Sequence, residues 1–227
     1  MTEKESKVFE HLAQFVSDHK KQFIDKVLDQ RTRQVTVVLE NIYQSQNASA
    51  VVRTCECMGL QDIHIIENTA MYGLNLRVLK GSNKWMTMER YQAKKINDTE
   101  VCFNKLRANG YKILVADPSE DGISIHDVDV SASRVALVFG NELTGVSDYA
   151  RENSDMRIRI PMFGFTESLN ISVSVAICVN ALVTKLHQSD QYLGLSQEEK
   201  DELKLAWFRK IVKRSDLIER EFLRAIE

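Results

Sequence analysis

The chain has 227 residues, of which 44% are hydrophobic and 27% are charged, and its formal net charge at pH 7 is −2. This length suffices for one sizeable domain with appendages. The charge balance excludes a chain that is basic throughout, but 30 lysines and arginines leave room for a local basic face that binds nucleic acid.

The sequence predicts a cytoplasmic protein with neither a membrane nor a metal partner. It shows no apolar run fit to span a bilayer, and its first residues, MTEKESK, lack a signal-peptide pattern. The cysteines form no CxxC pair and no histidine cluster accompanies them, which indicates reduced thiols rather than a zinc site. They are Cys55, Cys57, Cys102 and Cys178.

Two helices are predicted before about residue 33, because apolar residues such as Val8, Leu12, Ile24 and Leu28 recur at helical spacing. The other faces of these helices carry cations, which form either a solvated face or a basic patch against RNA phosphate. The sequence leaves both interpretations open. These residues are His19, Lys20, Lys21, Lys26, Arg31 and Arg33.

Strands and helices alternate along the centre of the chain. A buried strand is expected at 35–39, followed by a helix that ends at Gly59. Further strands are expected at 63–66, 87–91, 111–116, 134–139 and 156–160, with a helix at about 99–109. Short loops and near-continuous apolar strands favour an α/β domain with a parallel sheet. No GxGxxG follows a strand, which disfavours dinucleotide binding.

The stretch from Ile160 to Val179, IPMFGFTESLNISVSVAICV, passes from a strand end through a turn into an apolar helix. Pro161 ends the strand, and Ser168 or a near neighbour is expected to cap the helix. The helix has almost no polar face, so we expect it to be buried. Polar groups at its start, Asn170 among them, need partners there. The stretch is therefore either a site or an ordinary capped core helix.

Two further stretches accompany it, NASAVVRTCECMG from Asn47 and LVFGNELTGVS from Leu137. In this order the three segments resemble the motifs of the SPOUT superfamily of methyltransferases, specifically the TrmH/SpoU family of RNA ribose 2′-O-methyltransferases. The resemblance runs from about Val35 to about Leu186. The matched positions are Asn47, Arg53, Phe139, Gly140, Glu142, Gly145, Ile160, Pro161, Gly164, Ser168, Leu169, Asn170 and Ser172.

The resemblance implies a SPOUT-type parallel sheet flanked by helices, with a deep C-terminal trefoil knot, in a homodimer. It implies 2′-O-methylation of RNA with S-adenosyl-L-methionine as cofactor, and the flanks resemble members that act on guanosine 18 of tRNA. The alternatives are methylation of ribosomal RNA and a catalytically silent RNA-binding module. The expected domains are an N-terminal helical extension at 1–33, the methyltransferase domain at 34–188 and a C-terminal helical extension at 189–227.

By the same resemblance, Arg53 stabilises the reacting oxygen or the adjacent phosphate, and Asn47 positions Arg53 or the substrate. Glu142 orients that arginine or the ribose. The implied catalytic residues are Arg53, Asn47, Glu142, Ser168 and Asn170, and the implied cofactor-binding residues are Ala116, Gly140, Ile160 and Leu169. At Gly140 the backbone would approach the ligand closely, so Gly140→Val is expected to abolish cofactor binding while leaving the fold mostly intact.

Two other segments are candidate RNA contacts. One comprises Ser82, Asn83 and Lys84, although helix capping explains Ser82 equally well. The other is the C-terminal tail, where SQEE from Ser196 predicts a capped helix. The last turns of that helix are basic, which fits either a docked helix or a tRNA-binding tail. The basic residues are Arg209, Lys210, Lys213 and Arg214.

Overall fold

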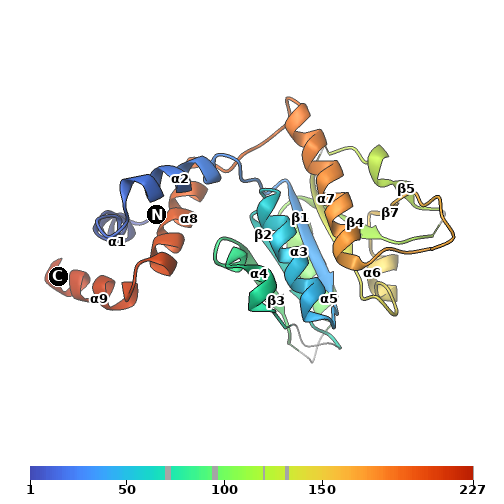
Figure 1. Cartoon of the computed structure of the whole chain (residues 1–227), viewed down its shortest axis with the longest axis horizontal. Helices are drawn as coiled ribbons and strands as arrows, with labels where there is room; N and C mark the ends of the chain where they lie inside the picture. Colours follow the sequence, from blue (N-terminus) through green and yellow to red (C-terminus); the bar gives the residue numbers. More distant parts are fainter. Residues whose placement is uncertain (70–72, 94–96, 120, 131–132, 227) are drawn as a thin grey trace. The chain divides into compact units, whose positions relative to one another are not determined.

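The computed structural model describes residues 1–69, 73–93, 97–119, 121–130 and 133–226 (Figure 1). It divides into two compact units. The central unit is Thr32–Leu193, and the terminal unit combines Met1–Arg31 with Gly194–Glu227. The two ends of the chain therefore belong to the same unit.

The central unit contains a seven-stranded parallel sheet in the order β3-β2-β1-β6-β4-β7-β5. This confirms the predicted α/β class and its parallel sheet. The two-residue strand β5 was not expected from the sequence. The strands are β1 Val35–Glu40, β2 Asp62–Ile66, β3 Thr87–Tyr91, β4 Tyr111–Ala116, β5 Ile123–Ser124, β6 Arg134–Phe139 and β7 Met156–Arg159.

Helices cover both faces of the sheet (Figure 1). On one face lie α3 (Ser45–Cys57) and α7 (Ile171–Gln188), and on the other lie α5 (Asp98–Ala108) and α6 (Asp148–Glu152). Strand β6 shows why its sequence reads as a continuous apolar run. Its alternate residues Val135, Leu137 and Phe139 pack in the core with α3 and α7, whereas Ala136 and Val138 pack with α5 and α6.

Helix α7 is half-buried, and our expectation that it is buried on all sides was wrong. Val175, Val179 and Leu182 recur at helical spacing on the buried side, but Val173 is 44% exposed and Asn180 is also exposed. By length and composition alone, α7 would qualify to cross a membrane, contrary to our reading of the sequence. Its buried stripe instead packs against α3 and the sheet, as in a core helix.

Three short elements lie in the loops of the central unit and were only partly expected. They are α4 (Leu76–Leu79), the 3-10 helix η1 (Ser82–Lys84) and the 3-10 helix η2 (Ile125–Asp127). Ser82 is buried and its hydroxyl donates to the carbonyl of Leu79 at 2.8 Å. It therefore secures a turn and does not face RNA. His126 lies at the surface.

The terminal unit consists of α1 (Glu3–Ala13), α2 (Asp18–Leu28), α8 (Gln197–Ile211) and α9 (Ser215–Ile226). Aromatic rings join the two ends of the chain, since Phe9 stacks on Phe208 with ring centroids 5.2 Å apart. The predicted cap of α8 is present as a capping box between Ser196 and Glu199.

Several cations of the N-terminal basic patch that the sequence suggested are buried or paired in the structure. Arg31 is buried, with its guanidinium 5.7 Å from the ring centroid of Trp207. Arg33 pairs with Asp62 at 2.8 Å, and Lys21 pairs with Asp18 at 3.1 Å. Of that set, His19 and Lys26 are exposed.

Candidate active site

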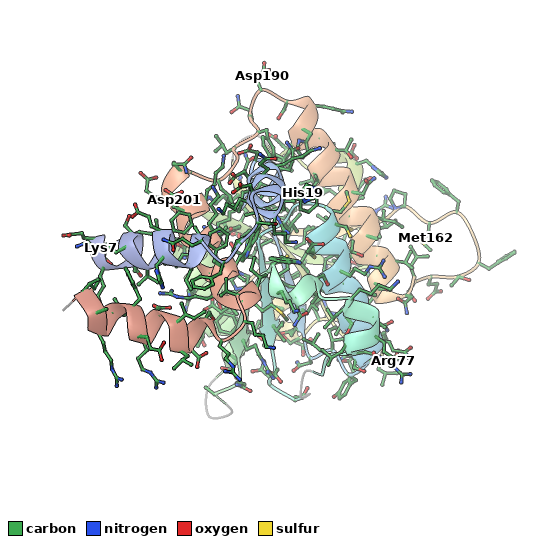
Figure 2. All side chains as sticks on the ribbon, turned by 60° about the vertical axis from the view of Figure 1, so that its left-hand side comes forward. Lys7, His19, Arg77, Met162, Asp190 and Asp201 are labelled. Atoms are coloured by element: carbon green, nitrogen blue, oxygen red, sulfur yellow. The ribbon has the colours of Figure 1, made fainter. Side chains whose placement is uncertain are left out.

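A pocket of about 460 Å³ opens at the carboxyl ends of β4, β6 and β7. Ligands in open α/β sheets bind at this edge, because the loops that follow the strands converge there. The loop after β7 closes one side of the pocket with Met162, Glu167 and Ser168. Figure 2 shows the part of this loop that carries Met162 extending away from the ribbon of α7.

Seven of the nine residues implied by the resemblance line this one pocket. They come from three separate segments of the sequence, and the parallel sheet brings them together because the carboxyl ends of its strands share an edge. The seven are Ala116, Gly140, Glu142, Ile160, Ser168, Leu169 and Asn170. The other two residues, Asn47 and Arg53, do not line the pocket.

Asn47 connects three elements at the pocket. It lies near the start of α3, and its side-chain amide donates to Oε1 of Glu142, in the loop after β6. Its Oδ1 accepts from Nδ2 of Asn170 at 3.2 Å. Asn170 is the N-cap of α7, with its own Oδ1 accepting from the amide of Ser172 at 2.9 Å. The polar groups at the start of α7 are therefore partnered across the site.

Gly140 lacks a side chain because the protein's own backbone lies beside it, which was not predicted from the sequence. A Cβ at this position would lie 2.0 Å from the backbone carbon of Gly145. The loop folds back at this point, and an antiparallel bridge pairs Asn141 with Gly145, whose φ is +69°. Protein backbone, and not the ligand, fills the space beside Gly140. The expectation that Gly140→Val leaves the fold mostly intact is therefore wrong.

Asn141 organises the same loop, although the motif comparison did not select it. Its Oδ1 accepts from the amides of Leu143 and Thr144 at 2.9 and 2.8 Å, which makes a local turn around Glu142. The Asn-Glu pair directly after a buried strand could have indicated this role, since asparagine favours such turns. Glu142 is thus held at the tip of a structured loop.

Asp117 also lines the pocket and was not selected from the sequence. It follows β4, and its carboxylate accepts from the guanidinium of Arg151 and from the amide of Ser119, both at 3.0 Å. Burial alone would raise the pKa of Asp117, but these hydrogen bonds outweigh burial and hold the pKa below its ordinary value. Asp117 therefore adds a fixed negative charge to the pocket wall.

Arg53 is exposed on α3 and is not among the residues that line the pocket. It makes no hydrogen bond or ion pair with the part of the chain that the structure describes. The carboxylate of Glu142 accepts from Asn47 and not from Arg53. Within one subunit, the structure does not bring Arg53 and Glu142 together as the resemblance implied.

His64 lies in the core and not at the pocket. Its ring is buried beside the hydroxyl of Tyr91, with Nδ1 and the hydroxyl oxygen 3.1 Å apart. Burial lowers the pKa of His64, so its neutral form is favoured. A buried neutral ring remote from the pocket has no part in its chemistry.

Comparison with known proteins agrees with this geometry. A model of the SpoU rRNA Methylase family matches residues 34–180. A relative from Borreliella burgdorferi, named tRNA (guanosine(18)-2'-O)-methyltransferase, is 39% identical over 208 residues, which cover 92% of this chain and 93% of the relative.

Solved structures are similar as well. The Aquifex aeolicus TrmH/SpoU tRNA modifying enzyme gives a TM-score of 0.75 at 27% identity, covering 86% of this chain and 98% of that one. An AdoMet-bound rRNA methyltransferase from Sinorhizobium meliloti gives a TM-score of 0.59 at 20% identity, covering 70% and 60%, and shows a shared fold alone. By the family match and the similarity to the Borreliella relative, this chain belongs to the SpoU rRNA methylase family.

Proposed function

We infer that this protein is an S-adenosylmethionine-dependent methyltransferase that modifies a ribose 2′-hydroxyl in tRNA, at guanosine 18. The observation that carries the inference is the hydrogen-bonded set of Asn47, Glu142 and Asn170, which come from three distant motifs and of which Glu142 and Asn170 line the pocket. The relatives named for guanosine 18 support the choice of RNA and position.

The pocket fits the proposed cofactor. Its volume of about 460 Å³ lies within the range of small-molecule sites. Ala116, Ile160 and Leu169 offer apolar and backbone contacts to an adenosine group. Asp117 is balanced by Arg151, but among the other lining residues Glu142 and Glu167 carry carboxylates and Arg159 carries the cation, so the wall favours a positively charged sulfonium. When bound, the cofactor supplies an electrophilic methyl group.

The residues of this chain would position the ribose hydroxyl and stabilise the charge that develops on it. The side-chain amide of Asn47 donates to Oε1 of Glu142. No described residue donates to Oε2, which is therefore available to the substrate. An arginine keeps its proton in proteins, so Arg53 serves as a cation for the reacting oxygen or its phosphate, not as a base.

Methylation of a tRNA transcript that lacks modifications tests the proposal. The matched control is the same transcript with a 2′-deoxyguanosine at position 18, which removes only the acceptor oxygen. We expect methyl transfer to the first and none to the second. Equal transfer to both would place the target elsewhere, and transfer to ribosomal RNA alone would favour the alternative substrate.

We also propose a homodimer. Beside the pocket, Phe163 is 98% exposed and Phe165 is fully exposed, and Leu143 and Val173 add to the uncovered apolar surface. Monomeric proteins rarely expose such a patch, and a second copy of the chain is the expected cover. In such a dimer Arg53 could be supplied to the pocket of the other subunit, because it does not line the pocket of its own.

Mixed dimers test this arrangement. Arg53→Ala and Glu142→Gln are each expected to be inactive. If the two residues serve one site from different subunits, random reassociation of the two variants restores one site in half of the dimers, or about a quarter of wild-type activity. If both act within one subunit, the mixture stays inactive. Size-exclusion chromatography before and after mixing verifies that subunits exchange.

We further propose the trefoil knot that the family resemblance implies and the cytoplasmic location that the sequence predicts. The knot would involve the loop between β7 and α7, which carries Glu167, Ser168 and Leu169 to the pocket. The free state of all four cysteines supports a reducing compartment.

A further inference from the structure

Glu40 is a buried carboxylate outside the pocket lining. It is the last residue of β1, and it is 1% exposed. Buried carboxylates need strong hydrogen-bond donors, and Glu40 has three. The Thr99 hydroxyl lies 2.5 Å from Oε1, the Ser147 hydroxyl lies 2.8 Å from Oε1, and the Ser147 amide lies 2.7 Å from Oε2.

Both donor residues lie at the starts of helices. Thr99 is in the first turn of α5, and Ser147 is the N-cap of α6, where its hydroxyl accepts from the amide of Ala150 at 3.1 Å. Helix starts carry partial positive charge, which stabilises a nearby carboxylate without a cation. Glu40 thus connects the end of β1 with two helices on one face of the sheet.

Ser147 also ends the loop that carries Glu142. At its beginning, the loop is fixed by the bridge between Asn141 and Gly145. The two hydrogen bonds from Ser147 to Glu40 fix its end. We propose that Glu40 is a positioning residue, which holds the 140–147 loop so that Glu142 meets Asn47 and the pocket keeps its shape. This proposal rests on the methyltransferase function proposed above.

Glu67 provides a matched control. It directly follows β2, the strand beside β1, and it is also buried. Its partner is Arg90, whose Nε and second guanidinium nitrogen each donate to it at 2.9 Å. These hydrogen bonds join the end of β2 to β3 and do not involve the 140–147 loop. A buried carboxylate is therefore lost in both Glu40→Gln and Glu67→Gln, but only Glu40→Gln disturbs the loop.

The first experiment compares these two variants. In Glu40→Gln, the new amide group must face one of the donors, so the loop loses an anchor. We expect single-turnover methyl transfer to a tRNA transcript to fall on the order of 100-fold, as for other misplacements at an active site. We expect Glu67→Gln to keep a near-native rate even if its melting temperature falls equally. Equal rates in the two variants would overturn the proposal.

The second experiment measures amide hydrogen exchange without RNA or cofactor, so it does not depend on the proposed reaction. Faster exchange at Leu143 and Thr144 is expected in Glu40→Gln and not in Glu67→Gln. Unchanged exchange in both variants would overturn the positioning role. Failure of the wild-type protein to methylate tRNA, with exchange as expected, would count against the function and not against the role of Glu40 in the loop.

Two single variants separate the partners of Glu40 and serve if Glu40→Gln folds poorly, and a double-mutant cycle adds a test if it folds. Ser147→Ala removes the hydroxyl anchor of the loop and keeps the amide anchor. Thr99→Val removes the contact of Glu40 with α5 and the hydroxyl that accepts from Nδ2 of Asn68 at 2.9 Å, and neither hydrogen bond involves the loop. We expect Ser147→Ala to slow methyl transfer and Thr99→Val to leave it near native. The effect of Ser147→Ala should also be largely absent in the Glu40→Gln background. Full additivity of Ser147→Ala and Glu40→Gln would contradict a shared role.

Discussion

Asn47 shows how much of the site depends on one side chain. Its amide donates to Glu142 and also to the side-chain oxygen of Gln44 at 3.0 Å, while its oxygen accepts from Asn170. An asparagine is suited to this position because it offers donors to a carboxylate and an acceptor to an amide at the same time. No charged residue provides both.

Asn47→Asp is therefore expected to disrupt the site. The change places a carboxylate against Glu142 and removes both donor hydrogens, which should cost about 1–3 kcal/mol of unfolding free energy for the unsatisfied buried groups. Methyl transfer should fall strongly. Urea unfolding and single-turnover assays measure the two effects. Gln46→Glu, the same charge change at an exposed neighbour, is the control, and equal loss in that variant would contradict a specific role.

Gly140→Ala gives a second test at the residue scale. Even one methyl group meets the backbone of Gly145 at 2.0 Å, so the loop must open. We expect a loss of about 3 kcal/mol in unfolding free energy, at the upper end of overpacking costs. Gly164→Ala has open space around its Cβ and should be near neutral. A stable Gly140→Ala variant would show that the loop adapts.

Much of the pocket lining could be predicted from the sequence, because motifs in fixed order resembled a family, and seven of the nine implied residues line the pocket whereas Asn47 and Arg53 do not. The physical reasons why those positions need those residues could not be predicted from the sequence. Gly140 is required by the backbone of Gly145, where the loop folds back on itself, and Glu40 is held by Ser147, which is distant in the sequence. Both contacts arise only when the chain has folded.

At the scale of elements, α3 presents two cysteines to different surroundings. Cys55 is buried in the core and Cys57 is exposed. Burial raises the pKa of Cys55 to about 12, so its thiol stays protonated and unreactive at pH 8. The same holds for Cys178 at the pocket, where burial also raises the pKa to about 12.

We expect a thiol-reactive dye at pH 8 to label Cys57 rapidly in the native protein and the other three cysteines only on unfolding. Mass spectrometry of labelled peptides identifies the sites. A Cys57→Ser variant should lose the rapid phase. Rapid labelling of Cys55 in the folded protein would show that α3 opens or that its buried face is misassigned.

The turn between α8 and α9 is the element where the proposed tRNA-binding tail can be tested. Lys213 and Arg214 are exposed and make no ion pair with any described residue, whereas Arg209 pairs with Glu219 at 2.7 Å. Replacing Lys213 and Arg214 by alanine should weaken tRNA binding and reduce its salt-dependence slope by about 2, at roughly 0.9 per phosphate contact. Lys200→Ala, which removes a lysine paired with Asp29, is the control.

Long elements were predictable because their apolar periodicity is strong, as in β4 and α8. The short helices α4 and α6 were not, because four or five residues contain too little periodicity to distinguish a helix from a turn. The exposed side of α7 was misread for a different reason. Its residues are apolar on both sides, so composition alone does not distinguish a core helix from one that a partner covers.

At the scale of the whole molecule, the proposed dimer predicts that its apolar patch controls assembly. Phe163→Ser combined with Phe165→Ser should shift the protein toward a monomer of 26.0 kDa in sedimentation at micromolar concentration. Leu76→Ser, at a residue that is 75% exposed on α4, is the control and should not change the mass. A wild-type protein that sediments as a monomer would contradict the dimer itself.

The terminal unit has a consequence for the order in which the chain matures. One of its segments is synthesised before the central unit and the other after it, and they depend on each other through the Phe9–Phe208 stack and the contact of Arg31 with Trp207. Helices α1 and α2 therefore leave the ribosome with their apolar stripes uncovered. Their apolar stripes stay uncovered until α8 and α9 have been synthesised, whereas the central unit, which ends at Leu193, can already fold. During that interval, the nascent chain presents surfaces that a chaperone would recognise.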